Sequence, residues 1–172
     1  MGTGAGGPEA DPIVVVDWDP AWPHAFQELA EPLRRATQGL GAKVEHVGST
    51  AVDGLAAKPI IDIDVVLRSP ASIPEAIARL GRLGYRHQGD HGIPGREAFA
   101  WPPWAKRHHL YLVVAGSEPH LNHIAFRDHL RSHPEDAAAY AALKRHLAHS
   151  FRHHRAAYTE GKSAFVRGIL GA

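Results

Sequence analysis

Two aspartates in an otherwise apolar segment are the residues of this sequence best suited to chemistry. Asp62 and Asp64 alternate with branched apolar residues in the run 60–66. Because successive side chains of a strand point to opposite faces, both carboxylates would lie on one face, about 7 Å apart at their Cα atoms. Two such carboxylates repel each other, and a divalent cation with oxygen ligands removes that conflict. The segment therefore favours a Mg²⁺ site, with a solvated strand face as the alternative.

A short polar turn precedes the two aspartates. Gly48, Ser49 and Thr50 follow a β-branched segment that ends at Val47. Glycine permits close backbone approach, and free backbone N–H groups beside a hydroxyl can hold a phosphate group. Lys58 lies between this turn and the aspartates and could reach the same phosphate. An ordinary turn and a solvated lysine are the alternative interpretations of these residues.

Two arginines further along the chain have the spacing of a phosphate clamp. Arg127 and Arg131 are spaced i, i+4, so a helix would place both on one face. Arginine can bind phosphate oxygens through two parallel hydrogen bonds. The alternative is a surface group of ion pairs that includes Asp128.

The C-terminal third carries two lysines and a tyrosine that could also bind phosphate. Tyr158 and Lys162 share a helical face by their i, i+4 spacing, and Lys144 belongs to the preceding helical pattern. We predict that these side chains line the cleft that faces the aspartates and bind phosphate there. A solvated helix face is the alternative.

The sequence contains fourteen histidines, and some of them are paired at helical spacing. His129 with His133, and His120 with His123, have spacings at which histidines can bind zinc. The glutamate of a His-Glu-x-x-His arrangement is missing. Among so many histidines such pairs are expected by chance, so ordinary surface histidines are the favoured interpretation.

Two tryptophans flank a Pro-Pro pair. Trp101 and Trp104 could form a platform on which a nucleobase stacks. A packed anchor for the loop is the interpretation that we favour.

The elements that position these residues follow from hydrophobic periodicity and from prolines and glycines. Residues 1–12 are glycine-rich with little to bury, and we predict that they are disordered. Residues 13–16 are expected to form an edge strand or an extended arm. Asp19 is the expected N-cap of a first helix that ends near 39–41. The later elements are strands over 44–47, 60–67, 97–101 and 109–114 with a short one at Tyr85, a polar loop over 89–96, and helices over 74–83, 121–133, from Pro134 onward and over 154–170.

The order of the polar motifs adds a resemblance. A strand that ends in Gly-Ser, followed by Asp-apolar-Asp on the next strand, resembles the signature of the DNA polymerase β-like nucleotidyltransferase superfamily. Within it the chain is most similar to the GrpB family, also called UPF0157. The long middle motif from His46 to Ile63 is specific, and the resemblance extends over nearly the whole chain. The other residues that carry it are Trp18 to Trp22, His109 to Val113, Phe126 to Arg131, Tyr140, Leu143, Lys144, Tyr158, Lys162 and Phe165.

The resemblance implies an α/β fold in which helices flank a mixed sheet, with a helical C-terminal third. It implies that Ser49 contacts phosphate and that Asp62 and Asp64 bind Mg²⁺. The superfamily usually has a third carboxylate on a later strand, where this chain offers His109 or Tyr111. A histidine there could bind a metal or act as a base. A tyrosine is a poor Mg²⁺ ligand, so Tyr111 is a candidate for substrate contact.

Composition limits the classes of protein to consider. A chain of 172 residues with 44% apolar residues suits one domain, expected over 13–172. The formal net charge is +1 and no basic-aromatic stripe is present, so nucleic acid is not a predicted partner. The absence of cysteine excludes disulfides and thiolate chemistry. We find neither a signal peptide nor a membrane span, and the expected location is the cytoplasm.

The sequence therefore predicts a Mg²⁺-dependent nucleotidyltransferase. It would transfer a nucleoside monophosphate from a nucleoside triphosphate to an acceptor that the sequence does not identify, with Asp62, Asp64 and His109 as catalytic residues. The alternative is a catalytically inactive module that binds a nucleotide or a phosphorylated metabolite, such as an accessory domain of dephospho-CoA kinase. Neither hypothesis implies an organic cofactor, and the sequence sets no oligomeric state.

Overall fold

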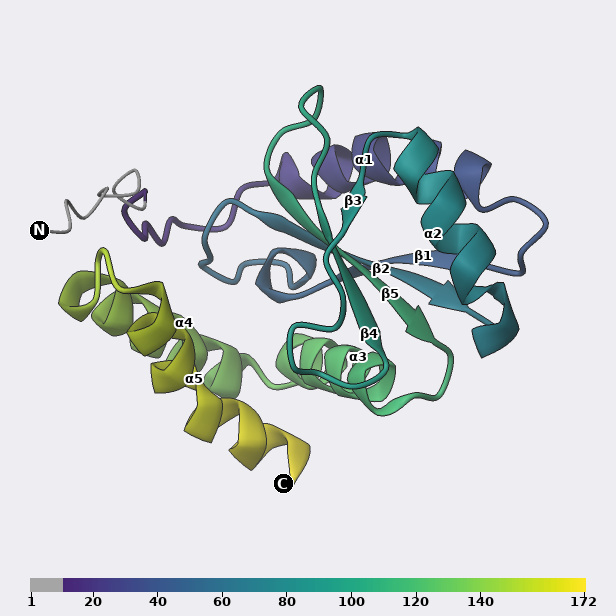
Figure 1. Ribbon diagram of the computed structural model, residues 1–172. Helices are drawn as coiled ribbons and strands as arrows, with labels where there is room; N and C mark the ends of the chain where they lie inside the picture. Colours follow the sequence, from purple (N-terminus) through teal and green to yellow (C-terminus); the bar gives the residue numbers. More distant parts are fainter. Residues whose placement is uncertain (1–10) are drawn as a thin grey trace, which may run out of the picture.

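The computed structural model describes residues 11–172, so the disorder expected over 1–12 falls almost wholly outside the described residues. Helices and strands alternate first, and three helices complete the chain (Figure 1). In order the elements are α1 (Trp22–Ala36), β1 (Lys43–Val47), the 3-10 turn η1 (Ser49–Ala51), β2 (Ile61–Leu67), the 3-10 turn η2 (Pro70–Ser72), α2 (Ile73–Arg82), β3 (Arg86–His87), β4 (Arg96–Ala100), β5 (His108–Val114), α3 (Glu118–Ser132), α4 (Pro134–Ser150) and α5 (Arg155–Leu170).

The strands form one five-stranded mixed sheet in the order β1-β2-β5-β4-β3. Only β2 and β5 are parallel to each other, and the remaining neighbours are antiparallel. The parallel register places Asp62 beside His109 and Asp64 beside Tyr111. Residues that pair in this way point to the same face, so the predicted catalytic residues share one face of the two central strands.

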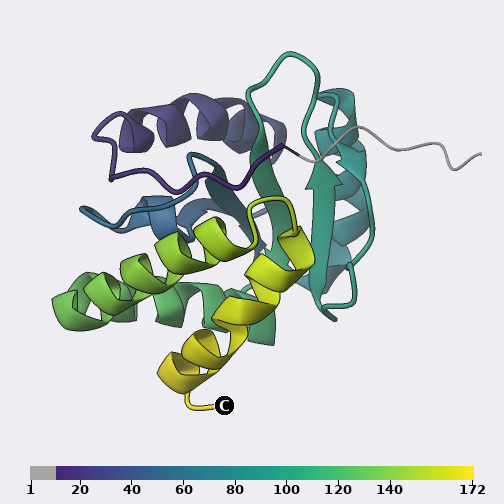
Figure 2. The same ribbon diagram turned by 90° about the vertical axis from the view of Figure 1, so that its left-hand side faces the viewer.

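Helices cover both faces of the sheet (Figure 2). The α1 and α2 helices lie on one face, and α3, α4 and α5 lie on the other. The main core packs α1 and α2 against the sheet and includes Phe26, Leu33, Ile61, Ile63, Val65, Leu67, Leu80, Leu110 and Leu112. The predicted alternation of β2 is therefore confirmed, since its apolar residues face this core. Each such side chain stabilises the fold by about 1.5–3 kcal/mol on burial, which fixes the register that turns the aspartates the other way.

The segment before β1 differs from the sequence expectation at one point, the N-cap of α1, and decides between two alternatives at another, residues 13–16. The N-cap of α1 is Ala21, and Asp19 is wrong for that role because its carboxylate accepts a hydrogen bond from the Ala21 N–H at 2.8 Å in a turn upstream of the helix. Residues 13–16 form the extended arm rather than a strand. The arm makes a single antiparallel bridge, between Val16 and Ala57, and Ile13 N donates to Arg152 O at 2.7 Å.

The other boundaries lie close to those expected from the sequence. The strands β1, β2, β4 and β5 and the helices α2 to α5 each begin and end within a few residues of the predicted ranges. Among residues 11–172 no helix has the length and apolar character needed to cross a membrane.

The close packing of α4 against α5 gives a stability prediction. A Cβ atom at Gly161 of α5 would lie 2.5 Å from Leu147 Cδ2 of α4, whereas one at Gly168 would meet nothing within 4 Å. Gly168→Ala should raise the free energy of unfolding by about 0.5–1 kcal/mol through helix propensity. Gly161→Ala should instead lower it by about 1 kcal/mol, because the added methyl overpacks the contact. Urea denaturation measures both, and equal stabilisation by the two changes would contradict this packing.

Candidate functional site

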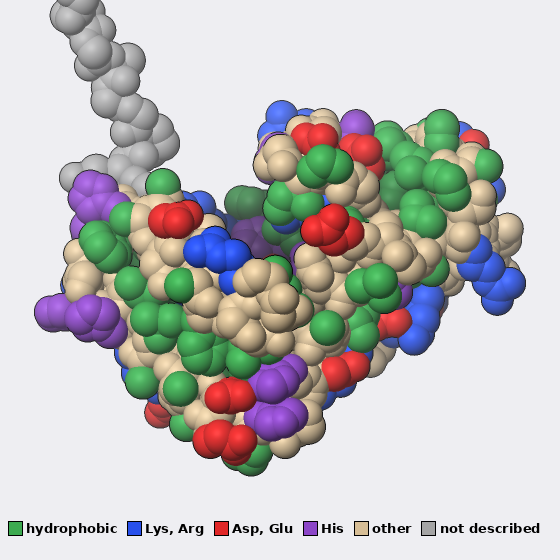
Figure 3. Space-filling view, turned by 90° about the horizontal axis from the view of Figure 1, so that it is seen from below, with side chains coloured by type: hydrophobic (Ala, Val, Ile, Leu, Met, Phe, Trp, Pro, Cys, Tyr) green, Lys and Arg blue, Asp and Glu red, His purple; other side chains and the backbone are tan. Residues whose placement is uncertain are grey.

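A cavity of about 340 Å³ lies between the aspartate face of the sheet and the C-terminal helices. We call it the central cavity. Seen from the side of these helices, the surface is hollowed, with lysine or arginine side chains at the edge and histidine inside (Figure 3). Its lining residues are Gly48, Ser49, Thr50, Ala57, Lys58, Ile60, Asp62, His109, Tyr111, Phe126, Tyr140, Lys144, Tyr158, Thr159, Lys162 and Val166.

Most of the residues predicted from the sequence therefore meet at one place. Three do not line this cavity: Asp64, Arg127 and Arg131. Sequence reasoning missed Tyr140, whose ring carries the Lys144 ammonium 4.6 Å from its centroid. The i, i+4 spacing of Tyr140 and Lys144 on α4 was the signal that could have revealed it.

Asp62 forms the sheet side of the cavity together with His109. The His109 Nδ1–H donates to Asp62 Oδ1 at 2.6 Å, and both side chains are about one third exposed or less. This bond leaves the Nε2 atom of His109 free to take or give a proton, as in other carboxylate–histidine pairs.

Gly48 is required where β1 ends and the turn begins. Its φ angle is +72°, and a Cβ atom there would lie 2.3 Å from Asp62 Oδ2. Both the backbone conformation and the missing side chain let the chain pass directly over the carboxylate. Ser49 is thereby held next to Asp62.

Lys144 is the most unusual group in the cavity. It is 2% exposed, and its Nζ donates to Ser49 Oγ at 2.9 Å and to the Ala56 carbonyl at 2.5 Å. Burial, followed by the nearby charge of Lys162, lowers the pKa of Lys144 to about 7. The buried ammonium therefore loses its proton easily unless a negative group comes close.

Two more lysines converge on the same space. The Nζ atoms of Lys58 and Lys162 lie 5.2 and 4.5 Å from the centroid of the Tyr158 ring. Burial, followed by the charge of Lys58, lowers the pKa of Lys162 to about 8. Burial also lowers the pKa of Lys58. Asp62 is the acid among the lining residues and acts on all three lysines, so positive charge exceeds negative charge in the cavity.

Asp64 lies deeper than Asp62, beneath α3. It has no exposed surface, and His123 of α3 donates from Nδ1 to Asp64 Oδ2 at 2.8 Å. The other oxygen, Oδ1, is buried without a hydrogen-bond partner among the described residues. Burial raises the pKa of Asp64, and the bond from His123 opposes that rise. Sequence reasoning did not connect His123 with Asp64, because no local pattern links a helix residue to a strand so far away in the chain.

The two arginines of the expected phosphate clamp hold the backbone near the cavity instead of lining it. Arg127 Nη1 donates to Glu45 Oε2 and to the His46 carbonyl, each at 3.1 Å. Arg131 donates from Nε and Nη2 to the Ala51 carbonyl at 3.0 and 2.7 Å. Both side chains thus fasten α3 to β1 and η1.

Thr50 and Tyr111 have structural partners within the cavity wall. Thr50 is 2% exposed, and its Oγ1 shares a 2.9 Å hydrogen bond with His46 Nε2. The Arg96 guanidinium lies 4.4 Å from the centroid of the Tyr111 ring. Burial raises the pKa of Tyr111 to about 12, so its hydroxyl stays protonated and can donate to a ligand.

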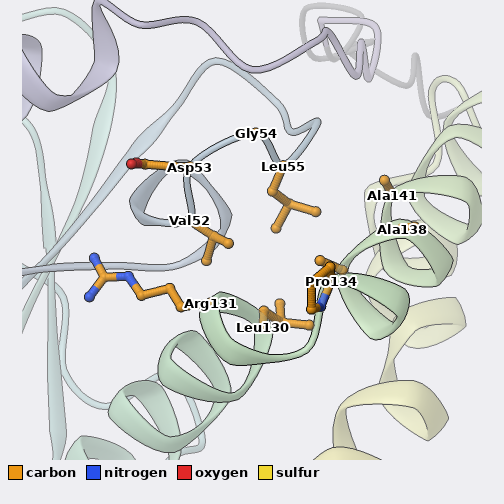
Figure 4. Close-up of a pocket in the computed structure, with 10 residues that line it drawn as sticks. Val52, Asp53, Gly54, Leu55, Leu130, Arg131, Pro134, Ala138 and Ala141 are labelled. Atoms are coloured by element: carbon orange, nitrogen blue, oxygen red, sulfur yellow. The ribbon is translucent and has the colours of Figure 1, made fainter.

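A larger hollow of about 570 Å³ lies on the outer side of the η1 loop, between Leu55 and the α3–α4 corner (Figure 4). Pro134, Ala138 and Ala141 of α4 form one wall. Its ionisable side chains are Asp53 and Arg131, and the Arg131 guanidinium is bound to a backbone carbonyl. The hollow therefore lacks the clustered groups that the smaller central cavity has.

The paired histidines are engaged within the protein. The rings of His129 and His133 stack with centroids 3.9 Å apart, and His129 Nε2 donates to Asp136 at 2.6 Å. His120 Nδ1 accepts the Gly116 N–H at 3.1 Å. Within residues 11–172 no group of three or more histidines, aspartates or glutamates is arranged to hold a metal ion.

The two tryptophans have different roles. Trp104 Nε1 donates to the Leu83 carbonyl at 2.9 Å, which fits the expected loop anchor. Trp101 is 40% exposed and carries the Arg107 guanidinium 5.6 Å from its ring centroid.

Comparison with known proteins decides the family. The sequence model described as GrpB protein matches residues 12–172. This chain belongs to the GrpB family. A UPF0157 protein of Pseudomonas aeruginosa is 42% identical over 166 residues, which cover 94% of this chain and 67% of that protein. YqkA of Bacillus subtilis, a further UPF0157 protein, is 30% identical over 155 residues, and this GrpB chain spans only 45% of its length.

Solved structures agree with the assignment. The crystal structure of GrpB from Enterococcus faecalis has a TM-score of 0.81 and 34% identity, and the match covers 92% of this chain and 95% of that one. A structure of the Cid1 poly(U) polymerase bound to MgATP has a TM-score of 0.51 and 10% identity, covering 76% of this chain and 45% of that one. This GrpB chain thus has the nucleotidyltransferase fold, as the order of its motifs predicted.

The contact between Gly48 and Asp62 can be tested by substitution. Gly48→Ala should lower the free energy of unfolding by about 2–4 kcal/mol, because a strained backbone and a clash with the carboxylate add together. Gly54→Ala is the matched control, since Gly54 has a similar φ of +81° but no atom within 4 Å of its added Cβ. It should cost only about 1–2 kcal/mol. Denaturation of both variants measures the difference, and equal losses would show that Asp62 does not crowd Gly48.

Proposed function

We propose that this GrpB protein is a Mg²⁺-dependent nucleotidyltransferase that transfers a nucleoside monophosphate from a nucleoside triphosphate to an acceptor. The observation that supports this function most is the distribution of charge across the central cavity. Asp62 lines the cavity from β2 of the sheet. Lys144 and Lys162 line it from α4 and α5, and Lys58 lines it from the loop before β2. A triphosphate with a bound cation complements both kinds of charge at once.

The lysines suit the triphosphate. Lys144 is buried, Lys58 and Lys162 are half-buried, and burial lowers the pKa of all three ammonium groups. A multiply charged anion would stabilise their protonated forms, since each ammonium would then lie next to a phosphate oxygen. Ser49 lines the same cavity as Asp62, and its Oγ accepts a hydrogen bond from Lys144 at 2.9 Å. Its hydroxyl proton and the turn at Gly48 add further donors for phosphate.

The carboxylates suit Mg²⁺. Asp62 faces the cavity, and the buried Asp64 Oδ1 atom has no hydrogen-bond partner among the described residues. An oxygen of this kind is a ready ligand for a hard cation. We propose that Asp62 and Asp64 would hold the ion, which supplies charge neutralisation for the phosphates.

His109 is positioned to act as the base. The acceptor oxygen would attack the α-phosphorus of the nucleotide, the bond from that phosphorus to the bridging oxygen would break, and pyrophosphate would leave. The acceptor proton would pass to His109 Nε2, while Asp62 holds the ring through Nδ1. His109 lies on β5, the strand on which the resemblance to nucleotidyltransferases implied a third acid.

The second candidate is a module that binds a nucleotide or a phosphorylated metabolite without turnover. The strand β5 offers His109 and Tyr111 in place of a further carboxylate, and Asp64 is covered by His123. A dephospho-CoA kinase of Mycolicibacterium paratuberculosis is 28% identical over 159 residues, a match that covers 39% of that protein. In this second function, the chain would act as an accessory module of such a kinase.

Binding and turnover separate the two functions. Each nucleoside triphosphate should raise the melting temperature of the protein, and Mg²⁺ should increase the shift. Asp62→Asn should remove the effect of Mg²⁺, and Lys162→Met should weaken nucleotide binding about tenfold, as expected for the loss of a charge-assisted hydrogen bond. Lys43→Met is the matched control, because Lys43 is 77% exposed and pairs with Glu45 outside the cavity.

Pyrophosphate release over a library of acceptors tests catalysis itself. The transferase should release pyrophosphate with at least one acceptor, and Asp62→Asn and His109→Gln should abolish or strongly reduce the release. Nucleotide binding that is independent of Mg²⁺ and yields no pyrophosphate would favour the binding module. No nucleotide binding at all would contradict the transferase, and it would leave only the phosphorylated-metabolite form of the second function.

A further inference from the structure

A second cavity of about 310 Å³ opens beside the central cavity, over the β4 and β5 strands. The two cavities share His109 and Tyr111 in their linings. A molecule in the second cavity would therefore lie next to the proposed base. We call this space the arginine cavity, and its remaining lining residues are Gln88, His91, Ala98, Phe99, Ala100, Trp101, Arg107, Leu110 and Arg155.

Two guanidinium groups from separate elements give the arginine cavity its charge. Arg107 lies in the loop before β5, and Arg155 is the first residue of α5. Burial and then the charge of Arg155 lower the pKa of Arg107, so the two cations repel each other. The acid that acts on Arg107 is Asp11, but its carboxylate is 86% exposed and lies 4.0 Å from Arg107 Nη1. Positive charge is thus poorly compensated here.

Arg107 also presents an unused donor. Its Nε atom is buried and has no hydrogen-bond partner within residues 11–172. A buried donor on a charged group is costly to leave unpaired. The guanidinium carbon also lies 5.6 Å from the centroid of the Trp101 ring, within the range of a cation–π contact that helps to hold the group in place. Such an oriented guanidinium can bind a planar carboxylate or a phosphate through two hydrogen bonds.

We propose that the arginine cavity binds the acceptor of the transfer through an anionic group, a phosphate or a carboxylate, held by Arg107 and Arg155. This inference rests on the proposed function and adds the chemical class of the acceptor. A neutral nucleobase would leave both cations uncompensated, whereas an anion pairs with them. The shared residue His109 then lies between the acceptor and the nucleotide, where the transferred proton must go.

Small anions can probe the site directly. The protein is first saturated with Mg²⁺ and a non-hydrolysable ATP analogue, and inorganic phosphate or acetate is then titrated in parallel samples. The Nε–H resonance of Arg107 in NMR spectra follows binding, and the two anions distinguish a phosphate site from a carboxylate site. We expect one of them to bind with the analogue in place and to shift this resonance.

Substitutions assign the effect to the arginines. Arg155→Gln and Arg107→Gln should each weaken the anion about tenfold and change the affinity for the analogue by less than about twofold. Arg155 is exposed, so its variant keeps the fold if Arg107→Gln does not. Arg152→Gln, an exposed arginine that lines neither cavity, is the matched control and should change nothing.

The possible failures are distinct. Anion binding that competes with the analogue, or that persists unchanged in Arg155→Gln, would overturn the proposed acceptor site. Failure of the analogue to bind, while Arg155-dependent anion binding remains, would contradict the proposed nucleotidyltransferase and leave only an anion site at these arginines.

Discussion

The buried ammonium group of Lys144 connects the C-terminal helices to the loop between β1 and β2. Its Nζ extends from α4 to Ser49 Oγ and the Ala56 carbonyl, both in the loop that connects β1 to β2. Removing an ammonium from water costs several kcal/mol, and two hydrogen bonds and the Tyr140 ring offset only part of that cost. The C-terminal helices cannot shift without leaving this group unpaired. The Lys144 ammonium also holds Ser49 at the cavity. The packing of the C-terminal helices and the proposed phosphate binding therefore both depend on the contact between Lys144 and Ser49.

The opposite wall depends on the sheet. The apolar face of β2 is buried against α1 and α2, and this burial fixes Asp62 and Asp64 on the face toward the cavity. The glycine at position 48 lets the backbone pass over Asp62, and His109 approaches it from the neighbouring parallel strand. Asp62 on the sheet and Lys144 and Lys162 on packed helices thereby line one space, which complements a metal–triphosphate complex.

Patterns of neighbouring residues in the sequence predicted the helices and strands and the face on which each side chain lies. The period-2 alternation around Asp62 predicted a strand, and the spacing of Tyr158 and Lys162 predicted a helix with both side chains on one face. All three side chains line the central cavity. The same spacing rule put Arg127 and Arg131 on one face of α3, but which partners they meet there is a long-range matter. The fold turned both toward backbone carbonyls of β1 and η1. The cover of His123 over Asp64 and the pair of arginines beside Trp101 likewise depend on tertiary contacts that a single sequence does not encode locally.

The central claim is that the lysines of the central cavity bind a polyanion, and proton uptake on nucleotide binding tests this claim most directly. Lys144, with a pKa of about 7, is mostly neutral at pH 8, and a phosphate beside it should raise that pKa. Lys162, with a pKa of about 8, is about half neutral at pH 8 and adds to the uptake. Calorimetry of MgATP binding in buffers of different ionisation enthalpy should show about one to one and a half protons taken up per nucleotide at pH 8 and much less at pH 6. Lys144→Met should reduce the uptake at pH 8. Binding without proton uptake at pH 8, or uptake that Lys144→Met leaves unchanged, would contradict this account.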